Sequence, residues 1–380
     1  MNQLTNYKNI VPRAGVIILN LFYLLLLTAC HNKTYIQIIS DESSMEQKKP
    51  AHHTIDGFTN LYAPPVTKGP FGYWKMRLFG NEDFAEHEEN SHLIAIADSN
   101  LDSIEKGEPA EVKVTWIGHS TFLIQHQNIS ILTDPIFSDR ASPLSFAGPK
   151  RLVPLPIKFK DLPPIDFIII SHNHYDHLDL ETIKLFGNNT QFIVPLKLKA
   201  WFIEQGISTE KISEFDWWDT AVFDELTITA TPSQHWSART LFDRNKTLWA
   251  SWHLQIKDFS IWFAGDTGYN DIQFKEIGDH FQKIDLSLIP IGAYAPRWFM
   301  KQQHVNPAEA VLIHEDVKSK QSIGMHWGTF QLTAEEIDAP KKELEVALKT
   351  RNISNEDFQT LAIGETFRYK VTKTIKIHDH

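Results

Sequence analysis

The sequence predicts an α/β fold in which short buried strands alternate with helices. Apolar runs rich in β-branched residues recur, for example at 112–116, 167–170 and 259–263, and such runs are typical of strands. Helical segments are indicated between them, at 180–186 and at 307–315, the latter with a proline in its first turn. Most of the expected strands end in His, Asp or Gly. Because binding sites in α/β sheets form beyond the strand ends, a polar site is expected along one edge.

The expected elements follow one another along the chain. Strands are predicted at 112–116, 122–124, 129–132, 167–170, 191–194, 226–230, 248–256, 259–263, 286–289, 322–325 and 367–375. Helices are predicted at 180–186, 196–206, 307–315 and 333–349. A capping box, Thr333 with Glu336, is expected to open the last helix. The proline-rich segment 138–164 is expected to be a long loop, and such loops are often functional.

The composition limits the classes of function. The 380 residues carry a formal net charge of -10, with 42% apolar and 22% charged residues, which is typical of a soluble globular protein. The negative charge argues against a nucleic acid partner and against binding to anionic lipid through bulk charge. Cys30 is the only cysteine, so no internal disulfide is expected.

The N-terminus has the pattern of a secretory signal. Lys8 and Arg13 precede an apolar run at 16–27, which leads into Leu27-Thr28-Ala29-Cys30. This ending resembles a bacterial lipobox, so we expect a diacylated Cys30 that holds an extracytoplasmic protein at a membrane of the bacterial cell envelope. An uncleaved anchor helix is the alternative. Four regions are predicted: a lipoprotein signal peptide at 1–30, a flexible tether at 31–50, an aromatic-rich lead-in at 51–109 and the main domain at 110–380.

One segment has the residues of a metal site. His172-Asn173-His174-Tyr175-Asp176-His177 directly follows the strand expected at 167–170. Neutral imidazoles and carboxylates suit zinc and similar cations. His172 and His174 can point the same way, whereas Asp176 and His177 lie on the turn beyond and can reach a second ion. A solvated polar loop is the alternative, but this density of ligand-type residues after a buried strand is a strong metal signal.

Three later residues can complete a site for two ions. His235, Asp266 and His326 each follow an expected strand, although lone histidines are often structural and Asp266 could cap a turn. The predicted ligand sets are His172, His174 and His235 for one ion and Asp176, His177 and His326 for the other, with Asp266 as the bridge. A water or hydroxide between two such ions can attack phosphoryl or acyl centres. His52 and His53, in the lead-in, are expected to be solvated.

Longer strings surround these residues. They are Gln234-His235-Trp236, Phe263-Ala264-Gly265-Asp266-Thr267-Gly268-Tyr269, Pro290-Ile291-Gly292-Ala293-Tyr294, Pro296-Arg297-Trp298-Phe299-Met300, Gln303-His304-Val305 and His326-Trp327-Gly328-Thr329-Phe330. With the metal signature at 172–177, they resemble the N-acylphosphatidylethanolamine-hydrolysing phospholipase D family of the metallo-β-lactamase superfamily. The resemblance covers about residues 116–330. It implies a four-layer αβ/βα sandwich with a di-zinc site at one edge.

The resemblance also implies an activity. A zinc-dependent phosphodiesterase with two zinc ions per chain would use a metal-bridging hydroxide to cleave N-acylphosphatidylethanolamine into N-acylethanolamine and phosphatidic acid. Tyr175, Gln303 and His304 would contact the phospholipid, and Asp266 and His304 would have catalytic roles. The alternatives are a packing aromatic at Tyr175 and a surface loop at 303–304. The resemblance further suggests a homodimer.

Two other functions are compatible with the same residues. One is a lactonase or phosphodiesterase that acts on a soluble substrate, because a fold does not fix a function. The other is a non-catalytic zinc-binding surface lipoprotein, although structural zinc sites are usually closed and rich in cysteine. The lipobox departs from the family pattern because it is a bacterial feature, so access to the membrane is expected to depend on lipidated Cys30.

Overall fold

The computed structural model describes residues 37–38, 49–64, 72, 84–85, 87–97, 104 and 111–370. All of them belong to one compact unit, Gln37–His380. The predicted signal peptide with Cys30 and most of the predicted tether lie outside the described residues, so these regions stay predictions. Among the helices that are described, none has both the length and the apolar character needed to cross a bilayer.

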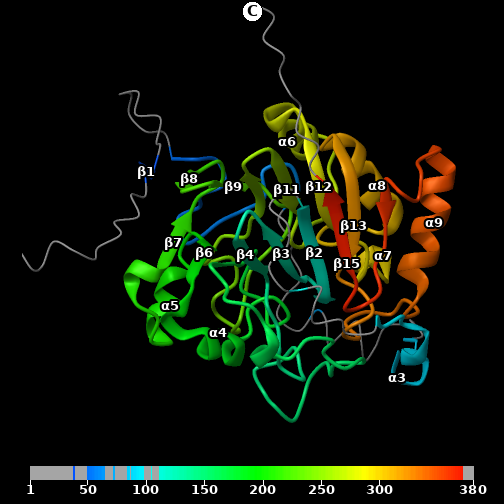
Figure 1. The fold of residues 1–380 in the computed structure, drawn as a ribbon, viewed down its shortest axis with the longest axis horizontal. Helices are drawn as coiled ribbons and strands as arrows, with labels where there is room; N and C mark the ends of the chain where they lie inside the picture. The colour runs from blue at the N-terminus through cyan, green and yellow to red at the C-terminus, as the bar shows by residue number, and fades with distance from the viewer. Residues whose placement is uncertain are drawn as a thin grey trace, which may run out of the picture. The chain divides into compact units, whose positions relative to one another are not determined.

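The described chain forms two mixed sheets (Figure 1). The first sheet has the order β15-β2-β3-β4-β5-β6-β7, and its strands β4 to β7 run parallel. Its strands are β2 (Glu111–Gly118), β3 (Thr121–His126), β4 (Ile129–Thr133), β5 (Phe167–Ile169), β6 (Gln191–Pro195), β7 (Ile212–Phe215) and β15 (Thr366–Lys370). The C-terminal strand therefore completes a sheet that is built mainly from the first half of the chain.

Apart from β1, the second sheet contains strands from the second half of the chain. Its order is β1-β8-β9-β10-β11-β12-β13-β14, with parallel pairing from β11 to β14. Its strands are β1 (Gln37–Ile38), β8 (Thr220–Phe223), β9 (Leu226–Thr231), β10 (Ser251–Ile256), β11 (Phe259–Phe263), β12 (Ile284–Pro290), β13 (Ser319–Met325) and β14 (Phe358–Gln359). Parallel pairing at the centre of both sheets brings several strand ends to one edge.

Helices cover the outer faces of both sheets. In Figure 1, α4 (Leu180–Phe186) and α5 (Lys199–Glu204) flank the first sheet, whereas α6 (Gln273–Phe281), α8 (Pro307–Asp316) and α9 (Ala339–Arg351) flank the second. Two short helices, α3 (His87–Asn90) and α7 (Arg297–Met300), belong to connecting segments. The order helix, sheet, sheet, helix confirms the predicted four-layer α/β sandwich.

Alternation along the strands explains the layers. On β5 and β6, Ile169 and Ile193 pack into the cluster that the two sheets share. Their neighbours Ile168 and Phe192 face the other way, in a cluster that contains Ile183 of α4. A period of two with apolar residues on both faces is what a strand between two layers requires. Each such fully buried side chain contributes about 1.5–3 kcal/mol relative to exposure.

Two local predictions are wrong. The helix predicted at 333–349 begins at Ala339, and the expected capping box at Thr333 does not form, because Pro340 fits only the first turn of a helix. His52 and His53 are not solvated: His52 is buried, and the two Nε2 atoms lie 2.6 and 2.7 Å from the carboxylate oxygens of Asp216. This pairing ties the lead-in to the segment before β8.

Candidate metal centre

The residues predicted to bind metal follow the carboxyl ends of four strands. The segment 172–177 comes after β5 of the first sheet, whereas His235, Asp266 and His326 come after β9, β11 and β13 of the second. The structure brings all seven side chains together at the edge where the two sheets meet. The sequence pattern of buried strands that end in polar residues therefore located the site.

Tight turns allow the strands to end so close together. His326 has a φ of 63° and Gly265 has a φ of 58°, both in the left-handed region. A Cβ at position 265 would lie 2.6 Å from the Cβ of Ser171, so only glycine lets the turn after β11 approach the loop after β5. This close approach places Asp266 beside the histidines of that loop.

Two groups of potential ligands are present. In the first group, His174 Nδ1 lies 2.8 Å from His172 Nε2 and 3.3 Å from His235 Nε2. In the second group, His177 Nε2 lies 3.2 Å from His326 Nε2, and Asp176 Oδ2 is 3.4 Å from both of these nitrogens. The first group is one predicted set, and the second contains the other predicted set together with His119, whose Nε2 lies 3.0 Å from Asp176 Oδ2.

Asp266 lies between the two groups. Its Oδ2 is 3.1 Å from His177 Nε2 and 3.8 Å from His235 Nε2, while its Oδ1 is 3.1 Å from His326 Nε2. One carboxylate is thus within reach of both groups, which is the arrangement that a bridging ligand requires. The geometry places Asp266 where the sequence predicted it.

Hydrogen bonds behind the histidines fix which nitrogen faces the centre. Asp134 Oδ2 accepts from His177 Nδ1 at 2.7 Å, and the carbonyl oxygen of Gln303 accepts from His235 Nδ1 at 2.9 Å. Because a carboxylate or carbonyl can only accept, each Nδ1 carries the proton and each Nε2 of the neutral ring keeps its lone pair.

The same logic applies to His172. Its Nδ1 is 2.8 Å from Ser171 Oγ, which in turn donates to Asp134 Oδ2 at 2.5 Å. The lone pairs of His172, His177 and His235 therefore point into a space that also holds the carboxylate of Asp266. Converging lone pairs repel one another unless a cation lies between them, so this donor set fits bound metal.

Burial and charge act differently on the two groups. Burial lowers the pKa of His235 to about 4, which keeps the ring neutral and able to act as a ligand. Burial also acts to lower the pKa of His326, but the carboxylates of Asp266 and Asp176 outweigh it and raise this pKa to about 9. The negative charge that attracts a proton to the second group also attracts a cation.

A cavity of about 570 Å³ gives access to the centre. Its lining includes His174, Asp176 and Asp266 together with apolar side chains such as Trp236 and Phe299. The three residues predicted to contact substrate, Tyr175, Gln303 and His304, also line it. The cavity thus combines a charged end with an apolar wall.

The structure places these three predicted contacts in different ways. His304 Nδ1 is buried without a hydrogen-bond partner among the described residues and lies 3.9 Å from Asp266 Oδ2. The Gln303 side chain is buried, and its backbone carbonyl orients His235. Tyr175 is half-buried and donates from its hydroxyl to the carbonyl oxygen of Arg239 at 2.7 Å.

Sequence reasoning missed two residues that support the centre. Asp134 follows the strand predicted at 129–132, and an Asp after a strand was the signal used for Asp266, but no role at the site was predicted for Asp134. Asn60, in the lead-in, brackets the backbone of His235: its Nδ2 donates to the carbonyl oxygen at 2.9 Å and its Oδ1 accepts from the amide at 3.1 Å. No short-range pattern links Asn60 to the site.

Comparisons with known proteins agree with this architecture. The family described as "Beta-lactamase superfamily domain" matches residues 130–327. The chain is 42% identical over 263 residues to N-acyl-phosphatidylethanolamine-hydrolyzing phospholipase D 1 of Caenorhabditis elegans, which covers 66% of this chain and 74% of the relative. It is 38% identical over 249 residues to the mitochondrial enzyme of the same description from Saccharomyces cerevisiae, covering 63% of this chain and 53% of the relative.

A solved structure shows the same fold. The isothiocyanate hydrolase from Delia radicum gut bacteria superposes with a TM-score of 0.56 and 20% identity, covering 68% of this chain and all (100%) of that chain. At this identity the likeness concerns the fold alone.

Proposed function

Because this chain belongs to the N-acylphosphatidylethanolamine-hydrolysing phospholipase D family of the metallo-β-lactamase superfamily, and is therefore a metal-dependent hydrolase, we propose that it cleaves a membrane phosphodiester. The proposed substrate is N-acylphosphatidylethanolamine, and the products are N-acylethanolamine and phosphatidic acid. The proposed cofactor is a pair of zinc ions. The observation that carries the proposal is the convergence of histidine lone pairs and carboxylates at one end of a cavity with an apolar wall.

Zinc is proposed because of the donor atoms. The two groups offer imidazole nitrogens and carboxylate oxygens, and this mixture suits zinc. Calcium and magnesium prefer sites in which every ligand atom is oxygen. The proposed ligands are His172, His174 and His235 in one group, Asp176, His177 and His326 in the other, and Asp266 between them. Two cations held there would neutralise charge on the phosphoryl oxygens and make the attacking water more acidic.

The chain's own residues orient the reaction. Asp134, Ser171 and the Gln303 carbonyl hold the histidine rings in place, so little reorganisation is needed when charge develops. His304 Nδ1 is buried, has no hydrogen-bond partner in the described part of the chain and lies 3.9 Å from Asp266 Oδ2, so the neutral ring can donate to a phosphoryl oxygen. The oxygen of water forms the new bond to phosphorus, the N-acylethanolamine oxygen leaves with a proton, and phosphatidic acid remains.

Exposed apolar residues near the cavity support a lipid substrate. Three segments line the cavity, through Ala141, Leu241 and Phe299. The same segments expose Phe146 to 77%, Phe242 to 83% and Trp298 to 66% of their surfaces. We call these three side chains the apolar rim. Large apolar side chains gathered on neighbouring segments are costly in water and are typical of surfaces that contact a membrane or a partner.

Membrane attachment is a separate part of the proposal. Lipidation of Cys30 would hold the enzyme at the bacterial cell envelope, and the rim would bring the cavity to the lipid surface. A diacylated cysteine supplies two acyl chains, which give stable attachment, and the rim would turn the cavity toward the lipid surface. We therefore expect that the anchor and the rim act together.

Hydrolysis of vesicles that contain N-acylphosphatidylethanolamine tests the proposal, with both products quantified. The Asp266→Asn variant should lose activity because it removes charge from the position between the two groups. Asp258→Asn is the matched control, since Asp258 is exposed in the turn between β10 and β11, at the opposite end of β11 from Asp266. Elemental analysis should find two zinc ions per wild-type chain.

The outcomes separate the alternatives. If the metal-loaded protein releases neither product but hydrolyses lactones or soluble phosphodiesters, the proposed metal centre is supported and the proposed phospholipid substrate is wrong. If it binds zinc and hydrolyses no ester, the non-catalytic alternative is correct.

A variant of the apolar rim tests its role separately. Phe242→Ser should slow hydrolysis of vesicles but not of a short-chain soluble phosphodiester, and equal slowing of both would contradict a role for the rim at the lipid surface.

A further inference from the structure

Arg239 lies where two ligand-bearing segments meet. It follows His235 by four positions, on the loop after β9 of the second sheet. Its Nη1 donates to the carbonyl oxygen of Asn173 at 2.9 Å and to that of Leu178 at 2.8 Å. These two carbonyls stand at the beginning and the end of the loop after β5 that contains His174, Asp176 and His177.

The loop between these carbonyls has little other support from its own backbone. Its turn is closed by two hydrogen bonds to the carbonyl oxygen of His174, from the amides of His177 at 3.1 Å and Leu178 at 2.8 Å. A change in this short turn would move ligands of both groups at once. One guanidinium that joins its two ends therefore restrains the separation of His174 and His177.

Aromatic rings hold the guanidinium itself in place. Its Cζ lies 4.1 Å from the ring centre of Tyr175 and 5.1 Å from that of Trp201. The Tyr175 hydroxyl donates to the Arg239 carbonyl, and the Asp243 carboxylate accepts from the Arg239 amide at 3.1 Å. Such stacking and planar hydrogen bonding are properties of arginine that lysine does not share.

The energetic balance favours a specific role for this side chain. Burial lowers the pKa of Arg239, which shows that the charged form loses hydration in this position. Its Nη1 recovers hydrogen bonds from backbone carbonyls, not from a carboxylate. A buried charge lowers stability unless it is hydrogen-bonded. Removing the guanidinium would in turn leave the carbonyls of Asn173 and Leu178 without this donor.

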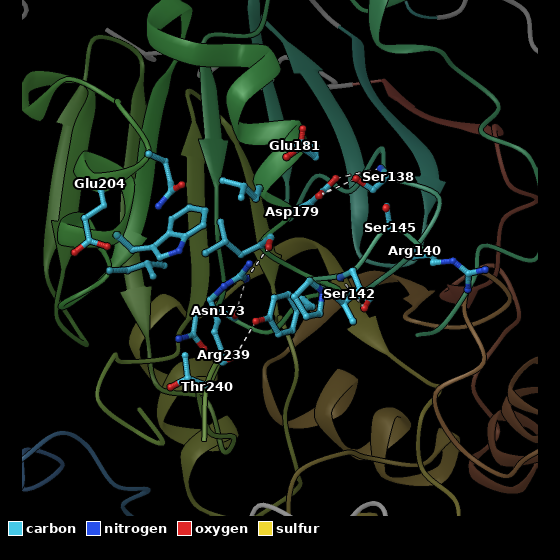
Figure 2. Close-up of a pocket in the computed structure, with 18 of the residues that line it drawn as sticks. Ser138, Arg140, Ser142, Ser145, Asn173, Asp179, Glu181, Glu204, Arg239 and Thr240 are labelled. Carbon is cyan, nitrogen blue, oxygen red and sulfur yellow. Dashed lines mark hydrogen bonds between the residues drawn. The ribbon is translucent and has the colours of Figure 1, made fainter. Parts of the chain in front are cut away.

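Arg239 also stands in a wall between two cavities. Together with Tyr175 and Thr240 it lines both the cavity at the metal centre and a second one of about 940 Å³. Figure 2 shows Arg239 and Asn173 side by side in the lining of the second cavity, with Ser138 and Asp179 bonded to each other elsewhere in it. Leu178 packs in the core and Asp134 holds His177, and Arg239 adds a restraint that acts on both ends of the loop.

We propose that Arg239 is a positioning residue that sets the geometry of the metal centre by joining the two ends of the loop 173–178 to the loop that follows His235. The inference rests on the proposed metal centre but not on the proposed substrate. Arg239 acts through the carbonyls of Asn173 and Leu178 and does not touch the metal. Its loss would loosen ligands contributed by both sheets.

Metal affinity is the direct test. Arg239→Met keeps an unbranched side chain and removes the guanidinium, and it should weaken zinc binding about 10- to 100-fold, the range for residues that orient metal ligands. Arg239→Lys keeps the charge and should lose less. The matched control is Arg244→Met, because Arg244 is on the same loop and lies 4.1 Å over the ring of Trp236. Its zinc affinity should equal that of the wild type.

The assay uses the purified protein, stripped of metal and titrated with zinc against a chromophoric chelator. The visible spectrum of the cobalt(II)-loaded protein reports the ligand geometry independently of catalysis, and the Arg239→Met spectrum should differ from that of the wild type. Thermal unfolding of the metal-free forms shows whether each variant folds. If Arg239→Met does not fold, Arg239→Lys decides: weaker binding supports the proposal, and wild-type affinity overturns it.

Three results would count against the inference in different ways. If the wild type binds zinc and Arg239→Met binds it equally well with the same cobalt spectrum, Arg239 does not position the ligands. If the wild type binds no metal, the proposed metal centre itself is wrong. Loss of phospholipid hydrolysis without a change in zinc affinity or spectrum also counts against a positioning role.

Discussion

Replacing Asp134 by Asn tests whether a carboxylate behind the histidines tunes the metal centre. Asp134 is fully buried, and it accepts from the Ser171 amide at 2.7 Å, from Ser171 Oγ at 2.5 Å and from His177 Nδ1 at 2.7 Å. An amide has only one acceptor oxygen, so its NH₂ group must face at least one of these donors. In either orientation a hydrogen bond is lost and a negative charge that supports the basicity of His177 disappears.

The expected size of the effect follows from these contacts. A buried donor left without a partner costs about 1–3 kcal/mol. Residues that orient metal ligands change metal affinity about 10- to 100-fold, and at 1.4 kcal/mol per tenfold this equals about 1.4–2.8 kcal/mol. The two ranges agree, so we expect the zinc affinity of Asp134→Asn to fall by about one to two orders of magnitude.

A matched variant separates this effect from a general loss of stability. Asp285 is also buried, near the start of β12, and its Oδ2 accepts from the amide of Ser260 at 3.1 Å. Asp285→Asn should lower the urea midpoint of unfolding but leave zinc affinity unchanged. Competition titrations on both variants measure the contrast. Wild-type affinity in Asp134→Asn, or the same loss in Asp285→Asn, would refute the reasoning.

Three further predictions concern other parts of the structure. Gly265→Ala should impair both folding and zinc binding, because the new Cβ would lie 2.6 Å from the Cβ of Ser171; an unchanged zinc titration would contradict this close approach. Asn306→Ala should destabilise the protein by about 1 kcal/mol in urea unfolding, because Asn306 accepts from the amide of Glu309 at the start of α8. Burial acts to raise the pKa of Asp216, but the hydrogen bond and charge of His52, the Trp217 amide and the charge of His53 together outweigh it, so the folded-state pKa is lowered from 3.8. Asp216 thus stabilises the fold above that pH, and the stability difference from Asp216→Asn, measured in urea at pH 7 and pH 3, should shrink on acidification.

Local patterns were enough to predict the candidate ligands, which the structure brings together, but not the residues that support them. Strand β5 is an uninterrupted apolar run, β11 is interrupted only by Ser260, and the last four residues of β13 are buried, so the polar residues that follow these strands stood out in the sequence. Strands β7 and β8 were missed because each has partly exposed positions and only four residues. The helix α6 was missed because its mean hydropathy is low and only some of its residues are buried.

The supporting residues depend on contacts between distant segments. Asn60 is separated from His235 by 175 positions, and Arg239 contacts a loop 61 to 66 positions earlier. Nothing in the residues beside Asn60 or Arg239 indicates these partners. Only the packing of the two sheets brings them together, and a single sequence does not contain that information.

The origin of the ligands in two sheets has a consequence for how the protein is made. His172, His174, Asp176 and His177 belong to the first sheet, whereas His235, Asp266 and His326 belong to the second. A chain in which only one half has folded offers an incomplete set and holds metal weakly, so the free energy of metal binding is added only when the halves have docked. Because the last of these residues is His326, a complete set exists only after synthesis has passed that position. Metal bound by all seven residues would therefore mark a chain that has already assembled both halves.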